Sequence, residues 1–104
     1  MRRRPRLSLE AITDLDRIRD HVAASSGSAA ANLLVNRIEA TLKKTVFRFE
    51  SCGRPRPELG AHVRSYAYPP YVVFYEITGS GVRVLRILHG HRDIKEALMS
   101  LLIA

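Results

Sequence analysis

One stretch decides the fold of this chain: YVVFYEITGSGVRVLRIL, residues 71–88. Its two halves, residues 71–77 and 82–88, consist mostly of aromatic and β-branched side chains, which fit the pleated surface of a β-sheet. The segment between them contains Gly79 and Gly81, and tight hairpin turns favour glycine. The stretch therefore predicts two antiparallel strands joined by a short turn.

The charges of this hairpin indicate its register. A two-residue loop at Gly79-Ser80 would pair Thr78 with Gly81, and Glu76 would then face Arg83, where unlike charges attract. One face would carry Val72, Phe74, Glu76, Arg83, Leu85, Ile87 and His89. The other would carry Tyr71, Val73, Tyr75, Ile77, Val82, Val84, Arg86 and Leu88. Since both faces are largely apolar, we expect helices to cover one and a protein partner to cover what remains of the other.

The sequence before the hairpin predicts one more strand and two helices. Residues 61–67 form a weaker β-like run, which Tyr68-Pro69-Pro70-Tyr71 joins to the hairpin. Apolar side chains recur every three or four residues over about 9–24, with Ser8 as a plausible N-cap, and again as far as about Glu50. The polar break at residues 25–28 makes these two helices an antiparallel pair.

These elements together predict a single α+β domain over residues 1–104. Its expected order is a short N-terminal strand within residues 2–9, a two-helix antiparallel hairpin, a three-stranded antiparallel sheet and a short C-terminal segment. A chain of 104 residues with 46% apolar and 26% charged side chains suits one globular domain. No stretch approaches a membrane helix, the basic start lacks the apolar run of a secretory signal, and Cys52 is the only cysteine. We therefore expect a protein of the reducing cytoplasm that does not enter a membrane.

The charge of the chain points to an acidic or polyanionic partner. Lys and Arg number 17 against ten Asp and Glu, which gives a formal net charge of +7. Fourteen of the 17 are Arg, the side chain whose planar fork grips phosphate and carboxylate groups. Charge alone is equally compatible with a basic protein that is merely kept in solution. The run Arg2-Arg3-Arg4-Pro5-Arg6 could contact DNA phosphates or form a solvated end.

Several motifs, in this order of elements, resemble one family. They are Glu58-Leu59-Gly60, then Arg64, then Pro70-Tyr71-Val72-Val73-Phe74-Tyr75, and finally Val84-Leu85-Arg86-Ile87-Leu88-His89-Gly90-His91-Arg92-Asp93. The set resembles the RelE/ParE superfamily of toxins from bacterial type II toxin–antitoxin modules, and its ParE branch in particular. The last motif is the most specific, and the resemblance covers nearly the whole chain.

The resemblance to the ParE branch implies a toxin that inhibits DNA gyrase by binding it, without a catalytic set of its own and without a cofactor. It also implies a ParD-like antitoxin as partner, in a hetero-oligomer whose DNA contact is made through the antitoxin. A RelE-like messenger-RNA interferase and an inactive toxin fold that only binds its partner are the alternatives. RelE-like toxins place Arg and Lys on the sheet and a Tyr after its last strand, whereas here position 72 is Val and no Tyr follows Asp93.

The candidate site residues come from these motifs and from the arginines of the predicted sheet, and no catalytic residue is expected among them. The expected antitoxin- or target-binding residues are Arg64, Tyr71, Phe74, Tyr75, Arg83, Arg86, His89, His91 and Arg92. Arg86 needs a carboxylate or an aromatic face, supplied either internally or by a partner. No metal site is expected, because only Asp93 lies close to the His89–His91 pair as a third ligand. An apolar tail of Leu98, Met99, Leu101, Leu102 and Ile103 is expected to contribute to toxicity.

Overall fold

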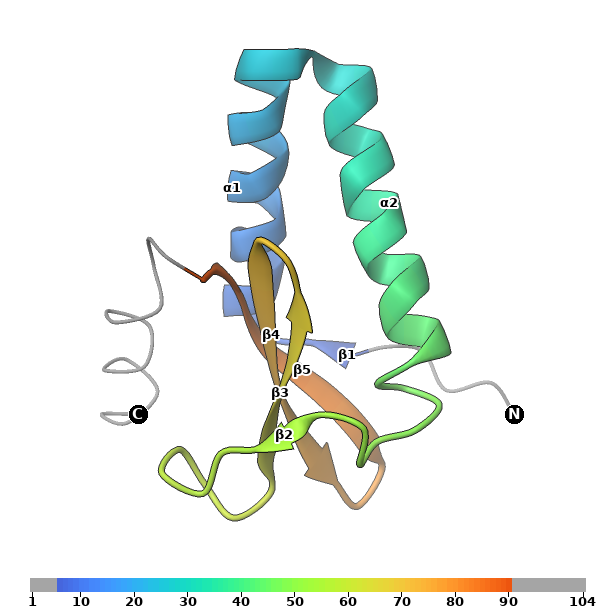
Figure 1. Cartoon of the computed structure of the whole chain (residues 1–104), viewed down its shortest axis with the longest axis vertical. Coiled ribbons are helices and arrows are strands. Elements are labelled where there is room, and N and C mark those ends of the chain that lie inside the picture. The colour runs from blue at the N-terminus through green and yellow to red at the C-terminus, as the bar shows by residue number, and fades with distance from the viewer. Residues whose placement is uncertain (1–5, 91–104) are drawn as a thin grey trace.

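The structure is a computed structural model in which residues 6–90 are described. Two helices and five strands follow one another along this part of the chain (Figure 1). In order they are β1 (Arg6–Leu7), α1 (Leu9–Ser26), α2 (Ser28–Lys44), β2 (Arg54–Pro55), β3 (Val63–Tyr68), β4 (Tyr71–Thr78) and β5 (Gly81–His89). The α+β class, the helical hairpin and the antiparallel β3–β4–β5 meander are as the sequence predicts. The predicted C-terminal segment lies outside the described residues.

The sheet has five strands in the order β1-β5-β4-β3-β2. All neighbours are antiparallel except β1, which runs parallel to β5 and pairs Arg6 with Arg83. The expected N-terminal edge strand is therefore present, and it joins the sheet directly. The additional strand β2 is a two-residue edge strand that ends in Pro55. The sequence did not predict it, because it contains no run of β-forming side chains.

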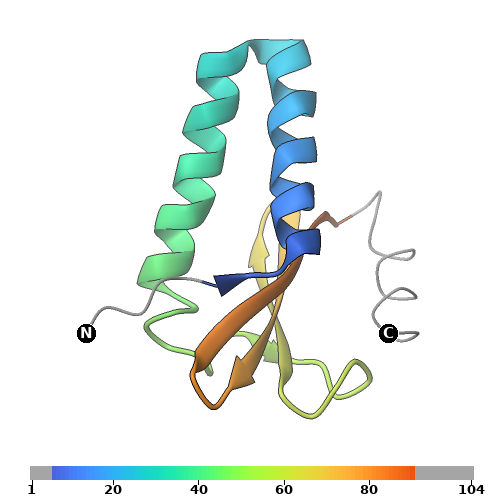
Figure 2. The ribbon, with the colours of Figure 1, turned by 180° about the vertical axis from the view of Figure 1, so that it is seen from behind.

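The helical hairpin stands against one face of the sheet and extends past it. Figures 1 and 2 show α1 and α2 rising side by side from the sheet, with their connection far from it. The main core lies between the sheet and those parts of α1 and α2 that are close to it. Its buried members are Ala11, Leu15, Ile18, Val35, Ile38, Leu42, Val46, Tyr71, Val73, Tyr75, Val82, Val84 and Ile87.

The helix ends differ from the predicted ones in two places. The first helix continues to Ser26, and Gly27 alone links it to α2 with a φ of 90°, a conformation open mainly to glycine. The second helix ends at Lys44 and not at about Glu50. The Thr45 hydroxyl donates to the Thr41 carbonyl at 2.8 Å, and the chain then continues in turns that keep the apolar spacing. Periodicity alone could not show that the regular helix had stopped.

A bulge in β5 corrects the predicted faces of the hairpin. Glu76 lies opposite Arg83, as the sequence predicts, but Phe74 pairs with Arg86 and Tyr75 with Val84. One extra residue, Leu85, therefore sits in β5, and the alternation beyond it shifts by one position. Ile87 packs in the helix-facing core and Leu88 lies on the other face, the reverse of the prediction.

The face turned away from the helices carries a smaller apolar cluster. Phe74 and Leu88 are buried there, with Leu59 and Val72 packed against them. The sequence motif Glu58-Leu59-Gly60 thus supplies cover for the second face from within the chain. Phe74 and Leu88 are 1% and 3% exposed in this single chain, so a protein partner on this face stays a prediction.

Candidate functional site

A buried ion pair ties the first helix to the last strand. Arg86 donates from Nε and from one terminal nitrogen to the two carboxylate oxygens of Asp14, at 2.8 and 2.9 Å. The backbone N–H of Ile87 donates to the same carboxylate at 3.0 Å. The side chain of Asp14 is 4% exposed and that of Arg86 16%. An internal acid thus partners Arg86, which was one of the two options that the sequence left open.

Asp14 is the residue that the sequence analysis missed. It falls three residues after Ala11 and four before Ile18, on the buried stripe of α1. Burying a carboxylate on the apolar side of a helix costs free energy unless a cation or hydrogen-bond donors pair with it. That position, together with an arginine on a largely apolar strand, was the available signal for the pair.

A buried tyrosine holds the loop between α2 and β2. The Tyr75 hydroxyl donates to the Glu50 carbonyl at 2.7 Å and accepts from the Gly53 N–H at 2.8 Å. Burial of this hydroxyl raises the pKa of Tyr75 to about 12. Because its ring is fully buried, Tyr75 acts on the surface only through the loop that it holds.

Arg64 holds the same loop from the other side. One terminal nitrogen of Arg64 donates to the carbonyls of Ser51 at 3.2 Å and of Gly53 at 2.7 Å. A Cβ on Gly53 would lie 2.5 Å from the Tyr75 hydroxyl and 2.8 Å from the Ser65 carbonyl, so only glycine fits at this point. The loop from Glu50 to Gly53 is thereby fixed by contacts with β3 and β4.

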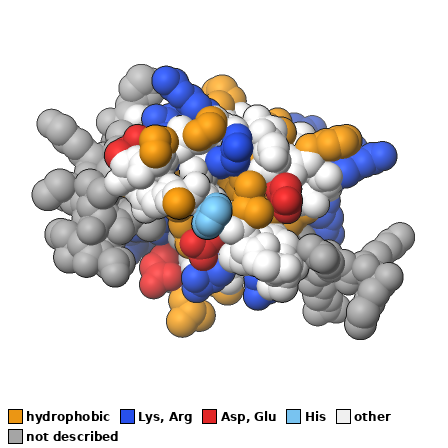
Figure 3. All heavy atoms as spheres, turned by 90° about the horizontal axis from the view of Figure 1, so that it is seen from below, with side chains coloured by type: hydrophobic (Ala, Val, Ile, Leu, Met, Phe, Trp, Pro, Cys, Tyr) orange, Lys and Arg blue, Asp and Glu red, His pale blue; other side chains and the backbone are white. Residues whose placement is uncertain are grey.

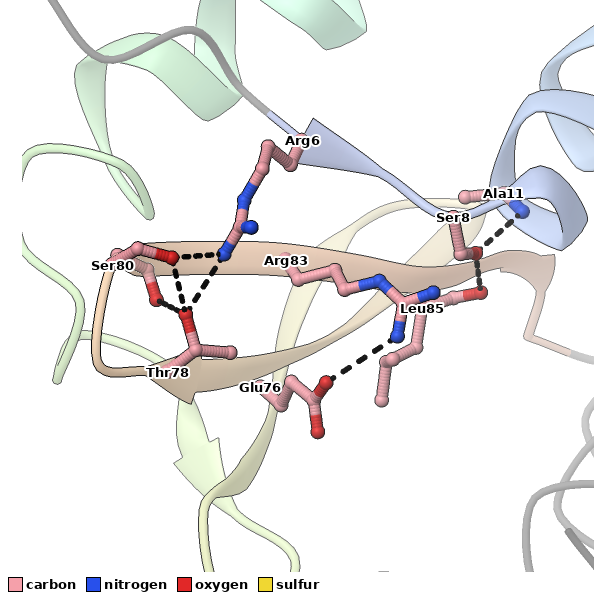
Figure 4. A network of polar contacts seen from close by, with 9 residues as sticks. Arg6, Ser8, Ala11, Glu76, Thr78, Ser80, Arg83 and Leu85 are labelled. Atoms are coloured by element: carbon pink, nitrogen blue, oxygen red, sulfur yellow. Dashed lines mark hydrogen bonds and ion pairs between the residues drawn. The ribbon is translucent and has the colours of Figure 1, made fainter.

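Polar contacts at the hairpin tip attach β1 to the rest of the sheet (Figure 4). Arg6 donates to the hydroxyls of Thr78 at 2.9 Å and Ser80 at 2.6 Å. Next to them, Arg83 and Glu76 form an ion pair at 3.6 Å in which the Arg83 side chain is 46% exposed. Since an exposed pair of this kind contributes little to stability, Arg83 can exchange Glu76 for another acid at small cost.

An open cavity of about 250 Å³ lies at the start of α1. Its lining residues are Leu9, Glu10, Thr13, Asp14, Arg17 and Arg86. Acidic and basic side chains both contribute to it, and two of them, Asp14 and Arg86, already form an ion pair with each other.

The remaining predicted site residues differ in how far they are exposed. Tyr71, Phe74 and Tyr75 are buried, so they support the surface from below and do not face a partner directly. Arg83 is exposed, and His89 stands edge-on to Tyr71 with ring centroids 5.9 Å apart. His91, Arg92 and the apolar tail of Leu98, Met99, Leu101, Leu102 and Ile103 lie outside the described residues.

Residues 6–90 contain no cluster of three side chains that could hold a metal ion. His21 lies on α1, His62 in the loop before β3 and His89 at the end of β5, so these imidazoles belong to different parts of the fold. In the same range, no helix has the length and apolar character needed to cross a bilayer.

Comparison with known proteins identifies the family. The model of the ParE toxin of the type II toxin–antitoxin system parDE matches residues 6–94. The chain belongs to the ParE toxin family.

 

All helices and strands from β1 to β5 fall within that match. This ParE-family chain is 33% identical to Toxin ParE3 of Caulobacter vibrioides over 85 residues, which are 82% of this chain and 84% of that toxin. It also matches a structure described as the chromosomal ParDE TA system from P. aeruginosa, with a TM-score of 0.69 and 26% identity over 81% of this chain and 91% of the other. The family that the sequence motifs indicated is therefore confirmed.

Proposed function

We propose that this type II toxin inhibits DNA gyrase and that a cognate ParD-like antitoxin neutralises it. The ParE family membership and the likeness to a ParDE system support the antitoxin partner. Gyrase is the target that resemblance to the ParE branch implies, and it places the action of the toxin in the cytoplasm. In this proposal the toxin–antitoxin hetero-oligomer contacts DNA through the antitoxin.

The internal partners of the sheet arginines favour gyrase over messenger RNA as the target of the toxin. A ribonuclease needs a cation beside the reacting phosphate and groups that transfer protons. Arg86 is instead paired with Asp14, and Arg64 with two loop carbonyls. The position after Tyr71 is Val72, and Tyr75 is buried with a raised pKa. These contacts favour a protein that acts by binding.

The test is to compare the two targets with the same purified full-length chain. With gyrase, ATP and plasmid DNA, we expect cleaved DNA to accumulate, and added antitoxin to prevent it. With ribosomes loaded with messenger RNA, we expect no new cuts. Codon-specific cuts in the transcript would replace the proposal with the interferase, and no effect in either assay would favour an inactive binding module.

The exposed Arg83 is the proposed antitoxin contact on the sheet. In an Arg83→Glu variant two carboxylates would face each other at the Glu76 pair, and an acidic antitoxin segment would be repelled. We expect antitoxin affinity to fall, and more steeply at low salt than at high salt, because salt screens exposed charges. The matched control is Arg17→Glu, an equal charge change on α1. Loss in the control alone would move the antitoxin site to the helical hairpin.

We also propose that the apolar tail contributes to toxicity and not to antitoxin binding. Deletion of residues 94–104 is expected to weaken toxicity while antitoxin binding is retained. The measurement is growth arrest on induction, set against antitoxin capture by the same truncated chain. Equal toxicity of the truncated and full-length chains would show that the tail does not contribute.

A further inference from the structure

Positive charge is concentrated at the end of α2 and in the loop that follows it. Residues 37–56 contain six basic and two acidic side chains, whereas α1 contains two basic and four acidic ones. Lys43, Lys44, Arg48 and Arg54 are all exposed. The surface formed by these four residues together with Phe49 is called the 43–54 surface below.

Within residues 6–90, no ion pair joins a cation of the 43–54 surface to an acid. The ion pairs within residues 6–90 join Arg19 to Asp16, Arg83 to Glu76 and Arg86 to Asp14. None of them involves a residue of the 43–54 surface. The last turn of α2 therefore presents positive charge that an external anion can meet without first breaking an internal pair.

An exposed aromatic ring lies among these cations. Phe49 is 59% exposed, and the Arg48 guanidinium carbon lies 5.4 Å from the centre of its ring. The N–H of Phe49 donates to the Thr45 carbonyl at 2.7 Å, a helix-like bond that keeps Phe49 close to Lys44. Figure 3 views the molecule from below, and on the side where α2 ends, blue Lys and Arg groups border an orange group.

The backbone that carries Phe49 and Arg54 is held in place before any ligand arrives. The Cys52 N–H donates to the Phe49 carbonyl at 2.9 Å. Tyr75 binds the backbone of Glu50 and Gly53 from the core, as described above. A surface fixed in this way loses less conformational entropy when it binds.

We propose that the 43–54 surface binds the phosphate backbone of a polynucleotide and stacks an unpaired base on Phe49. Unpaired lysines and arginines supply the contact with phosphates, which does not depend on sequence. An exposed aromatic ring beside them is the platform that single-stranded nucleic acids use, because every base has a face that can stack. An acidic peptide would also meet the charges, but the arginine and the ring together favour a base. Arg83 is not one of the residues of this surface, and binding to it requires no gyrase.

The first experiment measures binding of the full-length chain to labelled single-stranded DNA, duplex DNA and single-stranded RNA over a range of salt concentrations. The double variant Lys43→Ala/Lys44→Ala is expected to bind each probe about tenfold more weakly at low salt and to show a shallower dependence on salt. Its matched control, Arg17→Ala/Arg19→Ala, removes the same charge from α1 and should bind almost as the unaltered chain does. An equal loss in both variants would overturn the proposal, because it would reflect net charge alone.

A second variant tests the stacking. Phe49→Ser is expected to weaken binding of the single-stranded probes about tenfold and to leave duplex binding nearly unchanged. Circular dichroism of each variant checks that the fold is intact. Binding of antitoxin that falls with Lys43→Ala/Lys44→Ala, while nucleic-acid binding is unchanged or absent, would overturn the proposal in favour of a protein-docking surface. Gyrase activity is not a readout here, so failure of this proposal and failure of gyrase inhibition are distinguishable.

Discussion

Gly53 is the residue at which the packing of the loop against the sheet is tightest. A Cβ there would meet the Tyr75 hydroxyl at 2.5 Å and the Ser65 carbonyl at 2.8 Å. Gly53→Ala should therefore lower the free energy of unfolding by about 1–3 kcal/mol, the usual cost of overpacking. Gly79→Ala is the control, since nothing lies within 4 Å of a Cβ at Gly79. Urea denaturation of the two variants checks this, and equal midpoints would contradict it.

Because the hydroxyl of Tyr75 is buried, we expect part of the folding stability to be lost at alkaline pH. Its pKa is raised to about 12 in the folded chain, against about 10 for an exposed tyrosine. The folded state therefore holds the proton more tightly, and the stabilisation is complete below about pH 10 and is lost as the pH rises toward 12. The difference in unfolding free energy between the unaltered chain and Tyr75→Phe should shrink over that interval. Urea titrations at about pH 9 and pH 11.5 measure it, and a constant difference would contradict the assignment.

At the scale of elements, the Asp14–Arg86 pair joins α1 to the edge of β5. Asp14→Ala would leave the Arg86 guanidinium without its acid and the Ile87 N–H without its acceptor. We expect a loss of about 3–5 kcal/mol in the free energy of unfolding, as for other buried pairs broken on one side. Asp16→Ala removes an acid from an exposed pair with Arg19, and thermal melts should show it to be almost neutral. Similar losses in the two variants would show that the Asp14 pair is no stronger than a surface one.

The sequence predicted the elements better than their details. Repeating apolar positions identified both helices, and Ser8 caps α1 by accepting from the Ala11 N–H at 3.0 Å, as predicted. The pairing of Glu76 with Arg83 was also correct. The bulge at Leu85 was not predictable, because it depends on how β5 meets β1 and α1 and not on any local turn residue.

The candidate site was less predictable than the fold for the same reason. Arg86 was predicted to need a carboxylate or an aromatic face, but the acid that pairs with it lies 72 residues earlier in the chain. Arg64 was expected to bind the antitoxin or the target, and only the folded loop shows that its guanidinium binds two backbone carbonyls. Long-range contacts of this kind leave no periodic pattern in the sequence.

Across the whole molecule, stability should be uneven. The far end of the helical hairpin stands beyond the sheet in Figures 1 and 2, and the residues around Gly27 are mostly exposed. The amides near Gly27 should therefore exchange with solvent much faster than those of β4, which is buried between two strands. Hydrogen exchange under native conditions measures this, and equal protection of the two regions would contradict it.

The parallel pairing of β1 with β5 also has a consequence for the order of folding. The Ser8 hydroxyl donates to the Leu85 carbonyl across 77 positions of sequence, so β1 and Ser8 can join the sheet only after β5 has been synthesised. Contacts between such distant segments form slowly, because a long loop must close first. During synthesis the helical hairpin can form from contacts between α1 and α2, which are close in sequence. The pairing of β1 with β5 and the bond from Ser8 to Leu85 can form only after β5 has been made. The nascent toxin therefore cannot complete its sheet until β5 has been synthesised.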